Sequence, residues 1–216
     1  MSTRITVIGS TGLIGSEFLR NVEEGEYESV TAITRREIDG LLGKPFIRQV
    51  IHDFKDLESM RPDLKADVLV CALGTTIKTA GSQERFFEVD HDLPLKLAKI
   101  AREEGCKRFI LVSSVGADAR SKTFYLRVKG QLEAALKDIG FEALHILQPS
   151  MLLGDRLERR PGEALGKIVM KPLSILIPWN YKPIHARQVS AKIRQLSLST
   201  DSGNHVWLGR SLFNVN

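Results

Sequence analysis

Runs of apolar residues alternate along this chain with longer amphipathic stretches. The first run, Arg4 to Ile8, is rich in β-branched residues and predicts a strand. Immediately behind it, Ile14, Phe18 and Leu19 recur at helical spacing and predict an amphipathic helix. The same pattern predicts five further strands, at Ser29 to Thr34, Phe46 to Ile51, Asp67 to Leu73, Phe109 to Val112 and Ala143 to Leu147.

Two longer amphipathic stretches are expected to form helices between the later strands. One covers residues 83–104 and ends before Gly105, and Pro94 would kink it or divide it in two. The other carries Tyr125 and Lys129 and continues to about Asp138. Residues 78–82 show no clear period and are expected to form a loop.

The regular alternation stops after residue 150. A segment rich in arginine, proline and glycine at 155–163 precedes an expected short helix at 164–170 and an irregular stretch at 171–183. A final amphipathic helix is predicted from Arg187 to Ser199, and short strands are predicted at 205–208 and 212–215.

A glycine-rich turn lies between the first strand and the first helix. Gly9, Gly12 and Gly15 form a GxxGxxG pattern in the strand–turn–helix context that indicates dinucleotide binding. Glycine permits the tight turn, the close approach of a pyrophosphate and the packing of the helix on the strand, and the helix N-terminus offers free N–H groups. Ser10 and Thr11 would add hydroxyl donors. The alternative is a turn whose glycines are only structural.

These features together predict an α/β fold, a Rossmann-like doubly wound parallel sheet with the strand order 3-2-1-4-5-6. Residues 1–150 are expected to form the dinucleotide-binding domain. Residues 151–216 are expected to form a small C-terminal substrate lobe packed on that domain.

The residues after the second strand bear on the choice of cofactor. NAD-binding versions of this unit carry an acidic residue there, which binds the ribose hydroxyls. This chain has Arg35 and Arg36, and Glu37 comes a little late. A guanidinium would bind a 2′-phosphate through charge-assisted hydrogen bonds, so NADP(H) is favoured over NAD(H). The alternative is that both arginines point into water.

Two other strand ends are candidates for contact with the cofactor. Asp53, after the third strand, could accept a hydrogen bond from an adenine amino group, and it is equally well interpreted as a turn carboxylate. The fourth strand ends in Gly74, Thr75 and Thr76, whose small side chains would let a cofactor lie close.

The chemistry is expected beyond the fifth strand. Ser113 and Ser114 follow that strand at its carboxyl end, the edge at which open parallel sheets bind ligands. Tyr125 and Lys129 are four residues apart, so on a helix they share one face. An ammonium near a phenol favours the phenolate, which can exchange a proton with a carbonyl or alcohol oxygen. A Tyr-x-x-x-Lys match alone also arises on solvated helix faces, and the upstream glycine turn is what favours the functional interpretation.

Composition narrows the setting of the protein. A chain of 216 residues with 43% hydrophobic and 26% charged residues is typical of one large domain. Cys71 and Cys106 have no CxxC spacing, so neither a disulfide framework nor a metal site is expected. No apolar run of membrane length and no signal segment is apparent, which makes a cytoplasmic protein without a membrane partner the default. The net charge of +5 is not gathered into a basic stripe with aromatic residues, so no nucleic-acid partner is expected.

The order of the motifs resembles that of the short-chain dehydrogenase/reductase superfamily, in its atypical branch. That order is the glycine turn, Ser113-Ser114, Tyr125-x-x-x-Lys129 and Gln148-Pro149-Ser150. The chain more specifically resembles the Tat-interacting oxidoreductase-like proteins. The runs that carry this likeness are Gly105-Cys-Lys, Val112-Ser-Ser-Val-Gly-Ala-Asp118, Tyr125-Leu-Arg-Val-Lys-Gly130, Gly154-Asp-Arg-x-Glu158 and Arg160-Pro-Gly-Glu163.

The resemblance implies roles for individual residues. Tyr125 would be the general acid/base and Lys129 would hold the nicotinamide ribose. Ser114 would bind the substrate oxygen, with Ser113 as the second choice. Asp90 stands where extended members often carry an asparagine, which leaves its role open. The residues matching cofactor-lining positions are Gly9, Ser10, Thr11, Gly12, Leu13, Ile14, Gly15, Arg35, Asp53, Leu73, Gly74, Thr75, Ser113, Pro149, Ser150, Met151 and Leu152.

The main functional hypothesis is an NADP(H)-dependent oxidoreductase that acts on a small carbonyl or alcohol by hydride transfer. The second is a cofactor-binding regulatory or scaffold protein, and the third is an epimerase or dehydratase, which would prefer NAD. His185 and Arg156 are candidate substrate contacts, and a capping histidine and a solvated arginine are the alternatives. The protein is expected to be a monomer or a homodimer.

Overall fold

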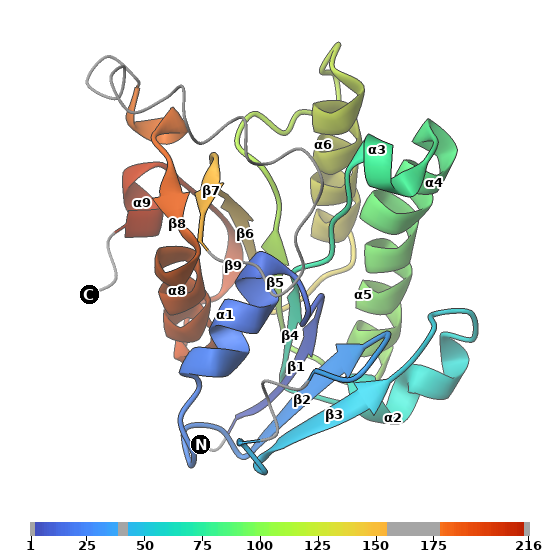
Figure 1. Ribbon diagram of the computed structural model, residues 1–216, viewed down its shortest axis with the longest axis vertical. Coiled ribbons are helices and arrows are strands. Elements are labelled where there is room, and N and C mark those ends of the chain that lie inside the picture. Colours follow the sequence, from blue (N-terminus) through green and yellow to red (C-terminus); the bar gives the residue numbers. More distant parts are fainter. Residues whose placement is uncertain (1–2, 39–42, 155–177, 214–216) are drawn as a thin grey trace.

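The computed structural model describes residues 3–38, 43–154 and 178–213. Its main element in these residues is a wholly parallel, seven-stranded sheet with the order β3-β2-β1-β4-β5-β6-β9 (Figure 1). The strands are β1 (Arg4–Ile8), β2 (Ser29–Thr34), β3 (Ile47–Ile51), β4 (Val68–Cys71), β5 (Arg108–Val112), β6 (Ala143–Gln148) and β9 (Gly203–Leu208). The six strands that the apolar runs predict all form, in the predicted order, and the Rossmann-like α/β fold is confirmed.

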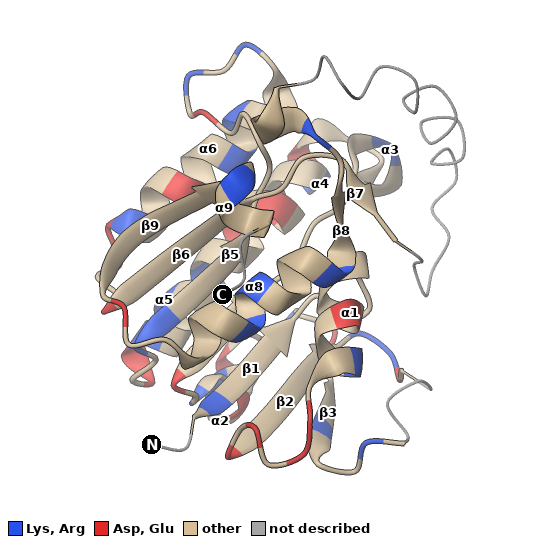
Figure 2. Ribbon diagram, turned by 90° about the vertical axis from the view of Figure 1, so that its left-hand side faces the viewer, with Lys and Arg blue, Asp and Glu red and all other residues tan. Residues whose placement is uncertain are grey.

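Helices cover both faces of the sheet. On one face lie α1 (Leu13–Asn21) and α8 (Ala186–Leu198), which pack side by side (Figures 1 and 2). On the other lie α5 (Leu93–Glu103) and α6 (Phe124–Lys137). The central strands are almost entirely apolar, as is usual for parallel strands that are buried on both faces of the sheet.

The predicted long helix at 83–104 is divided into three parts. α4 (Gln83–Phe87) passes into a π-helical turn, Glu88–Asp92, and α5 then begins at Leu93. Pro94 lies in the first turn of α5, where a missing N–H removes no helical hydrogen bond. The expected break is therefore confirmed.

The prediction of a loop at residues 78–82 was wrong, because α3 (Ile77–Ala80) begins there. The Thr76 side chain caps this helix by accepting a hydrogen bond from the Thr79 N–H at 3.1 Å. Gly81 ends it with a left-handed φ of 88°. Two short elements that the apolar pattern did not predict, the 3₁₀ turn Glu58–Met60 and α2 (Arg61–Leu64), complete the β3–β4 connection.

Two elements after position 150, β9 and α8, belong to the seven-stranded sheet and its helical cover. β9 pairs in parallel with β6, and α8 covers β1 and β4 through the same core as α1. A separate two-stranded sheet joins β7 (Leu152–Leu153) to β8 (Ile184–His185), and a 3₁₀ turn, Trp179–Tyr181, precedes β8. The predicted strand at 212–215 was wrong where it is described, because α9 (Arg210–Phe213) forms instead and buries Leu212. The segments predicted at 155–177, which include Arg156, lie outside the described residues.

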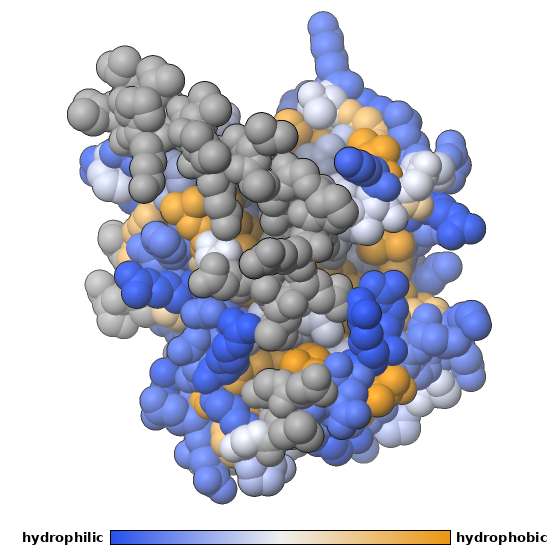
Figure 3. Space-filling model, viewed as in Figure 1, coloured by the Kyte–Doolittle hydropathy of each residue, from blue (hydrophilic) through white to orange (hydrophobic). Residues whose placement is uncertain are grey.

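Hydrophilic residues surround scattered hydrophobic patches on the face shown in Figure 3. Exposed large apolar side chains include Ile51, Met151, Trp179 and Tyr181. In the described part of the chain, no helix combines the length and apolar character needed to cross a membrane.

Candidate functional site

The glycine turn is packed so closely that only glycine fits at two of its positions. Gly9 has a φ of +84°, and a Cβ there would lie 2.4 Å from the carbonyl carbon of Ala72. A Cβ on Gly15 would lie 2.3 Å from the Gly9 carbonyl oxygen. Gly12 is the N-cap of α1, and its N–H donates to the Gly9 carbonyl at 2.9 Å. The turn therefore brings β1, β4 and α1 close together at the N-terminus of α1, in a glycine cradle that suits a pyrophosphate.

The side chains of the turn contribute less than the sequence suggests. Ser10 is buried, and its hydroxyl donates to the Val7 carbonyl at 2.9 Å, so it does not serve as the expected free donor. Leu13 and Ile14 are buried in the core beneath α1. Thr11 remains half-buried. Backbone N–H groups, with Thr11, are thus the donors that this turn can offer.

The two strand-end candidates near the adenosine side have different surroundings. Arg35 is exposed at the end of β2, as binding to a phosphate from solvent requires. Asp53 is exposed, accepts the Lys55 N–H at 3.0 Å and pairs with the Lys55 ammonium at 3.2 Å. The hydrogen bond from the Lys55 N–H is the main reason that the pKa of Asp53 is lowered. This geometry matches the turn-carboxylate interpretation of Asp53.

Tyr125 and Lys129 lie on the first turns of α6, as their spacing predicts. Tyr125 is half-buried, with its ring centroid 5.7 Å from that of Phe86. Lys129 is only 3% exposed, and its Nζ lies 2.8 Å from Asp90 Oδ1. Burial lowers the pKa of Lys129, but the attraction of Asp90 and Tyr125 outweighs it, and the pKa is raised. Lys129 is therefore held as an ammonium, one turn of α6 after Tyr125.

Asp90 is the functional candidate whose role the sequence left open. It is fully buried on the π-helical turn, and its Oδ2 accepts the Thr75 N–H at 2.8 Å. A π-helical turn is often found at functional sites. The signal in the sequence is that Asp90 follows Phe86 by four residues and precedes Leu97 by seven, so a lone acid lies on an otherwise apolar helix face.

The two serines after β5 have different environments. The Ser113 hydroxyl is buried and donates to the Glu133 carboxylate, which also accepts from Gln148 Nε2 at 2.9 and 3.0 Å. Burial raises the pKa of Glu133, although both donors oppose the shift. Ser114 is half-buried. The Ser114 hydroxyl donates only a long hydrogen bond of 3.5 Å to the Val115 carbonyl, so it is the hydroxyl that a substrate could recruit. Sequence reasoning missed Glu133 altogether.

The remaining expected cofactor residues lie at the exits of β4 and β6. Leu73, Gly74 and Thr75 are half-buried directly after β4. After β6, the Pro149 carbonyl accepts the Val115 N–H at 3.0 Å, so this exit lies beside that of β5. The chain then continues through Ser150, whose hydroxyl donates to the Lys182 carbonyl, Met151, which is 39% exposed, and Leu152 in β7.

His185 is exposed at the N-cap of α8, where its backbone N–H donates to Gln188 Oε1 at 3.1 Å. This position matches the capping interpretation of His185. Since all strands are parallel and β1, β4, β5 and β6 are neighbours, the glycine turn and these three exits share one edge of the sheet.

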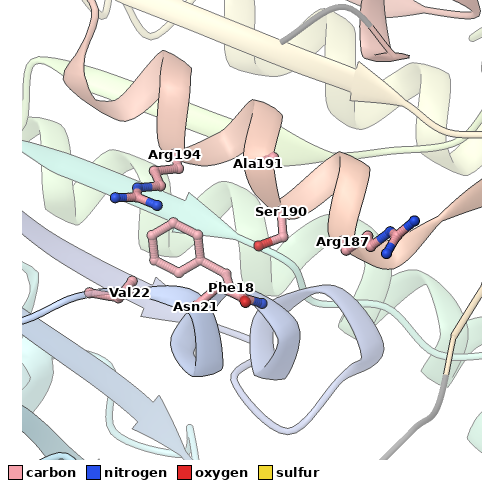
Figure 4. Close-up of a pocket in the computed structure, with 7 residues that line it drawn as sticks. All are labelled: Phe18, Asn21, Val22, Arg187, Ser190, Ala191 and Arg194. Carbon is pink, nitrogen blue, oxygen red and sulfur yellow. The ribbon is translucent and has the colours of Figure 1, made fainter.

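A separate pocket of about 190 Å³ lies between α1 and α8 (Figure 4). Phe18, Asn21 and Val22 line it from α1 and the residue after it, and α8 contributes Arg187, Ser190, Ala191 and Arg194. None of these residues is among those expected to bind the cofactor or to carry the chemistry. In the part of the chain that the structure describes, no three His, Cys, Asp or Glu side chains are grouped so as to hold a metal ion.

A parallel sheet of this order, with a glycine cradle at its carboxyl edge, defines the NAD(P)-binding Rossmann fold. Residues 5–126 match the NAD dependent epimerase/dehydratase family, and the chain belongs to that family.

Curated relatives share about a third of their residues with this chain. Protein fmp52 of Emericella nidulans is 34% identical over 169 residues, which cover 76% of this chain and 72% of that protein. Protein HTATIP2 of Rattus norvegicus is 37% identical over 167 residues, which cover 76% and 68% of the two chains. The resemblance to the Tat-interacting proteins is therefore confirmed.

Solved structures with a similar fold share few residues with it. MoeE5 in complex with UDP-glucose and NAD has a TM-score of 0.75 at 14% identity, over 95% of this chain and 76% of that one. The UDP-Glc/GlcNAc 4-epimerase of Campylobacter jejuni has a TM-score of 0.74 at 16% identity, over 98% and 82%. At such identities the likeness concerns the fold alone.

The expectation of a cytoplasmic protein is contradicted by the relatives. Proteins named as mitochondrial Fmp52 in Emericella nidulans, Saccharomyces cerevisiae and Eremothecium gossypii are 34%, 38% and 32% identical to this chain. The default drawn from missing membrane and signal segments was therefore wrong.

Proposed function

We propose that this protein is an NADP(H)-dependent oxidoreductase that reduces a small carbonyl compound or oxidises the corresponding alcohol. The observation that carries the proposal is that the half-buried Tyr125 lies one turn of α6 before Lys129, which is buried and charged. This pair lies on α6, which follows the β5 exit at the ligand-binding edge of the sheet. NADP(H) would supply the hydride chemistry once bound.

The residues of this chain divide the remaining tasks. Backbone N–H groups at the start of α1 hold the pyrophosphate, and Arg35 holds the 2′-phosphate. Tyr125 gives a proton to the substrate oxygen during reduction and takes it back during oxidation. Ser114 donates a hydrogen bond to the same oxygen and stabilises its negative charge. Lys129 supplies positive charge beside the phenol and a donor to the ribose.

The positive charge of Arg35, at the place expected to face the 2′-position of the adenosine ribose, supports NADP(H) over NAD(H). Arg35 is exposed where NAD-binding units carry an acid, and a guanidinium favours a phosphate there. Solved structures of the same fold in complex with NAD share only 14–16% of their residues with this chain. Such distant likeness concerns the fold, whereas Arg35 is a residue of this chain.

Tyr125→Phe tests the proposal. The variant should bind NADPH with unchanged affinity and lose turnover by about two orders of magnitude or more on a carbonyl substrate found by screening aldehydes, ketones and quinones. Tyr181→Phe is the matched control, because Tyr181 is 54% exposed and is not among the residues assigned to the cofactor or the chemistry, and it should keep full turnover. Full activity of Tyr125→Phe would refute the assigned role.

The second candidate is a cofactor-binding regulatory protein with little turnover. The observation that favours it is the Asp90–Lys129 ion pair, because Asp90 offsets part of the positive charge of Lys129 that would otherwise stabilise a phenolate. Tight NADPH binding by calorimetry, combined with no oxidation of NADPH by any compound in the screen, would favour this candidate over the enzyme.

A further inference from the structure

We propose that Asp90 is a positioning residue that sets the net charge of the site: by neutralising Lys129 it lets the site accept the positively charged oxidised nicotinamide ring alongside the neutral reduced ring. The inference rests on the proposed function, since it concerns the cofactor named there. It assigns a task to a residue that neither the glycine turn nor the Ser, Tyr and Lys set includes.

The ion pair is removed from solvent. Asp90 has no exposed surface, the Lys129 side chain is 4% exposed, and Asp90 Oδ1 lies 2.8 Å from Lys129 Nζ. Buried charges are screened far less than surface charges, so either side chain alone would exert a strong electrostatic effect on a nearby ligand. Together they carry a net charge of zero.

Asp90 is fixed from two sides. Oδ2 accepts the Thr75 N–H at 2.8 Å, and Oδ1 is engaged by Lys129. The carboxylate therefore cannot turn away without leaving a backbone N–H or a buried ammonium without its acceptor, each of which is costly. Asp90 thus ties the exit of β4 to the middle of α6.

The pair faces the exit of β4, one of the predicted cofactor-lining segments. An added Cβ on Gly74 would lie 3.5 Å from Asp90 Oδ1 and 3.8 Å from Lys129 Nζ, so the pair lies directly against a residue that has no side chain to cover it. A ligand lying across Gly74 would feel the summed charge of the two groups.

Among the described residues, the other ionisable groups that interact with Lys129 are Tyr125, Cys71 and Glu133, and all three are kept in the variants below. Burial raises the pKa of the Cys71 thiol on β4 to about 11, so the thiol is neutral. On α6, Glu133 interacts with Lys129 but is itself bound by Ser113 and Gln148. The charge that varies when Asp90 or Lys129 is replaced is therefore that of the pair.

Three variants test the proposal through cofactor affinity, without reference to turnover. Dissociation constants for NADP⁺ and NADPH are measured by calorimetry for the wild type, Asp90→Asn, Lys129→Met and the double variant. Two unit charges about 10 Å apart interact by roughly a tenfold change in an equilibrium constant at an effective dielectric constant of about 20. We therefore expect several-fold changes in the ratio of the two constants.

The expected signs are opposite for the two single variants. Asp90→Asn gives the site a positive charge and should weaken NADP⁺ binding relative to NADPH. Lys129→Met leaves a negative charge and should strengthen NADP⁺ binding relative to NADPH, and the double variant should return to the wild-type ratio. A residue with a merely structural role would weaken both forms alike.

Two results would overturn the proposal, and they are distinguishable from a failure of the proposed function. One is an unchanged ratio in both single variants, and the other is a shift of both in the same direction. If Asp90→Asn does not fold, Lys129→Met and the double variant still decide the matter, since an unchanged ratio in Lys129→Met alone overturns the inference. Absence of dinucleotide binding by the wild type would instead refute the proposed function, and this inference with it.

Discussion

The Ser113 hydroxyl donates a hydrogen bond to the buried carboxylate of Glu133, whereas the adjacent Ser114 hydroxyl is half-buried and makes only a long contact of 3.5 Å with the Val115 carbonyl. Two neighbouring serines that look equivalent in the sequence therefore have different tasks. Ser113 ties the end of β5 to α6, and Ser114 remains available for a substrate.

Replacing each serine by alanine should separate these tasks. Ser113→Ala removes a donor from a buried carboxylate and should lower the free energy of unfolding by about 1–2 kcal/mol. Ser114→Ala should leave stability unchanged and lower kcat by about 100-fold, the usual effect of removing one donor to a charged substrate oxygen. Urea unfolding and steady-state kinetics measure the two effects, and an exchange of the two phenotypes would contradict the assignment.

Removing one member of the Asp90–Lys129 pair should lower the free energy of unfolding more than removing both. Lys129→Met strands a buried carboxylate and should cost about 3–5 kcal/mol. Asp90→Asn combined with Lys129→Met removes both charges and should recover most of that loss, because a neutral pair needs no compensation. Unfolding free energies of the two variants provide the measurement. Additive losses in the double variant would show that the two side chains are not coupled.

Gly130→Ala should be destabilising despite the high helix propensity of alanine. A Cβ at Gly130 in α6 would lie 2.2 Å from backbone atoms of Asp118 and Ala119, so the loop after β5 must move. The expected loss is about 1–3 kcal/mol, as for other over-packed positions. Gly43→Ala is the control, since no atom of the described residues lies within 4 Å of its added Cβ, and it should have little effect on the melting temperature.

His145 should make the protein less stable in acid. Burial is the main cause that lowers the pKa of His145 from 6.5 to about 4, and His145 Nε2 has no hydrogen-bond partner among the described residues. The unfolded chain therefore binds a proton more readily than the folded one between these values. The contribution of His145 to the free energy of unfolding is fully present above about pH 6.5. It is lost as the pH drops to about 4, by up to about 3 kcal/mol.

His145→Gln should remove this part of the acid dependence in unfolding curves recorded from pH 7 to 4. The exposed His185 provides the control, and His185→Asn should leave the slope in place. An identical slope in His145→Gln would place the acid sensitivity elsewhere.

Arg35 should determine the preference between the two dinucleotides. Arg35→Ala should raise the Kd for NADPH by about tenfold or more and leave the Kd for NADH nearly unchanged, because only NADPH carries the 2′-phosphate. Lys55→Ala, which removes an exposed cation paired with Asp53 after the neighbouring strand, should alter neither constant. Equal effects of Arg35→Ala on both dinucleotides would contradict a role at the 2′-phosphate.

Local pattern was sufficient for most of the fold, because strands buried on both faces must be apolar and glycines at a tight turn have no substitute. The segments that apolar periodicity misread depend on a capping residue in one case and on burial against other elements in the other. Residues 77–80 form a helix whose first turn is capped by the Thr76 side chain. Residues 210–213 form α9 in place of a predicted strand, and Leu212 of this helix is buried in the core. Neither signal is visible in apolar periodicity.

The sequence by itself determined the parallel sheet, the glycine cradle between β1 and α1, and the shared face of Tyr125 and Lys129, since each follows from spacing along one or two elements. Only the tertiary structure decided that Asp90 forms an ion pair with Lys129, that the Ser113 hydroxyl donates to Glu133, and that β9 joins the sheet beside β6. Those relationships join residues from separate elements, and the strength of a buried charge or hydrogen bond depends on solvent exclusion that no single segment produces.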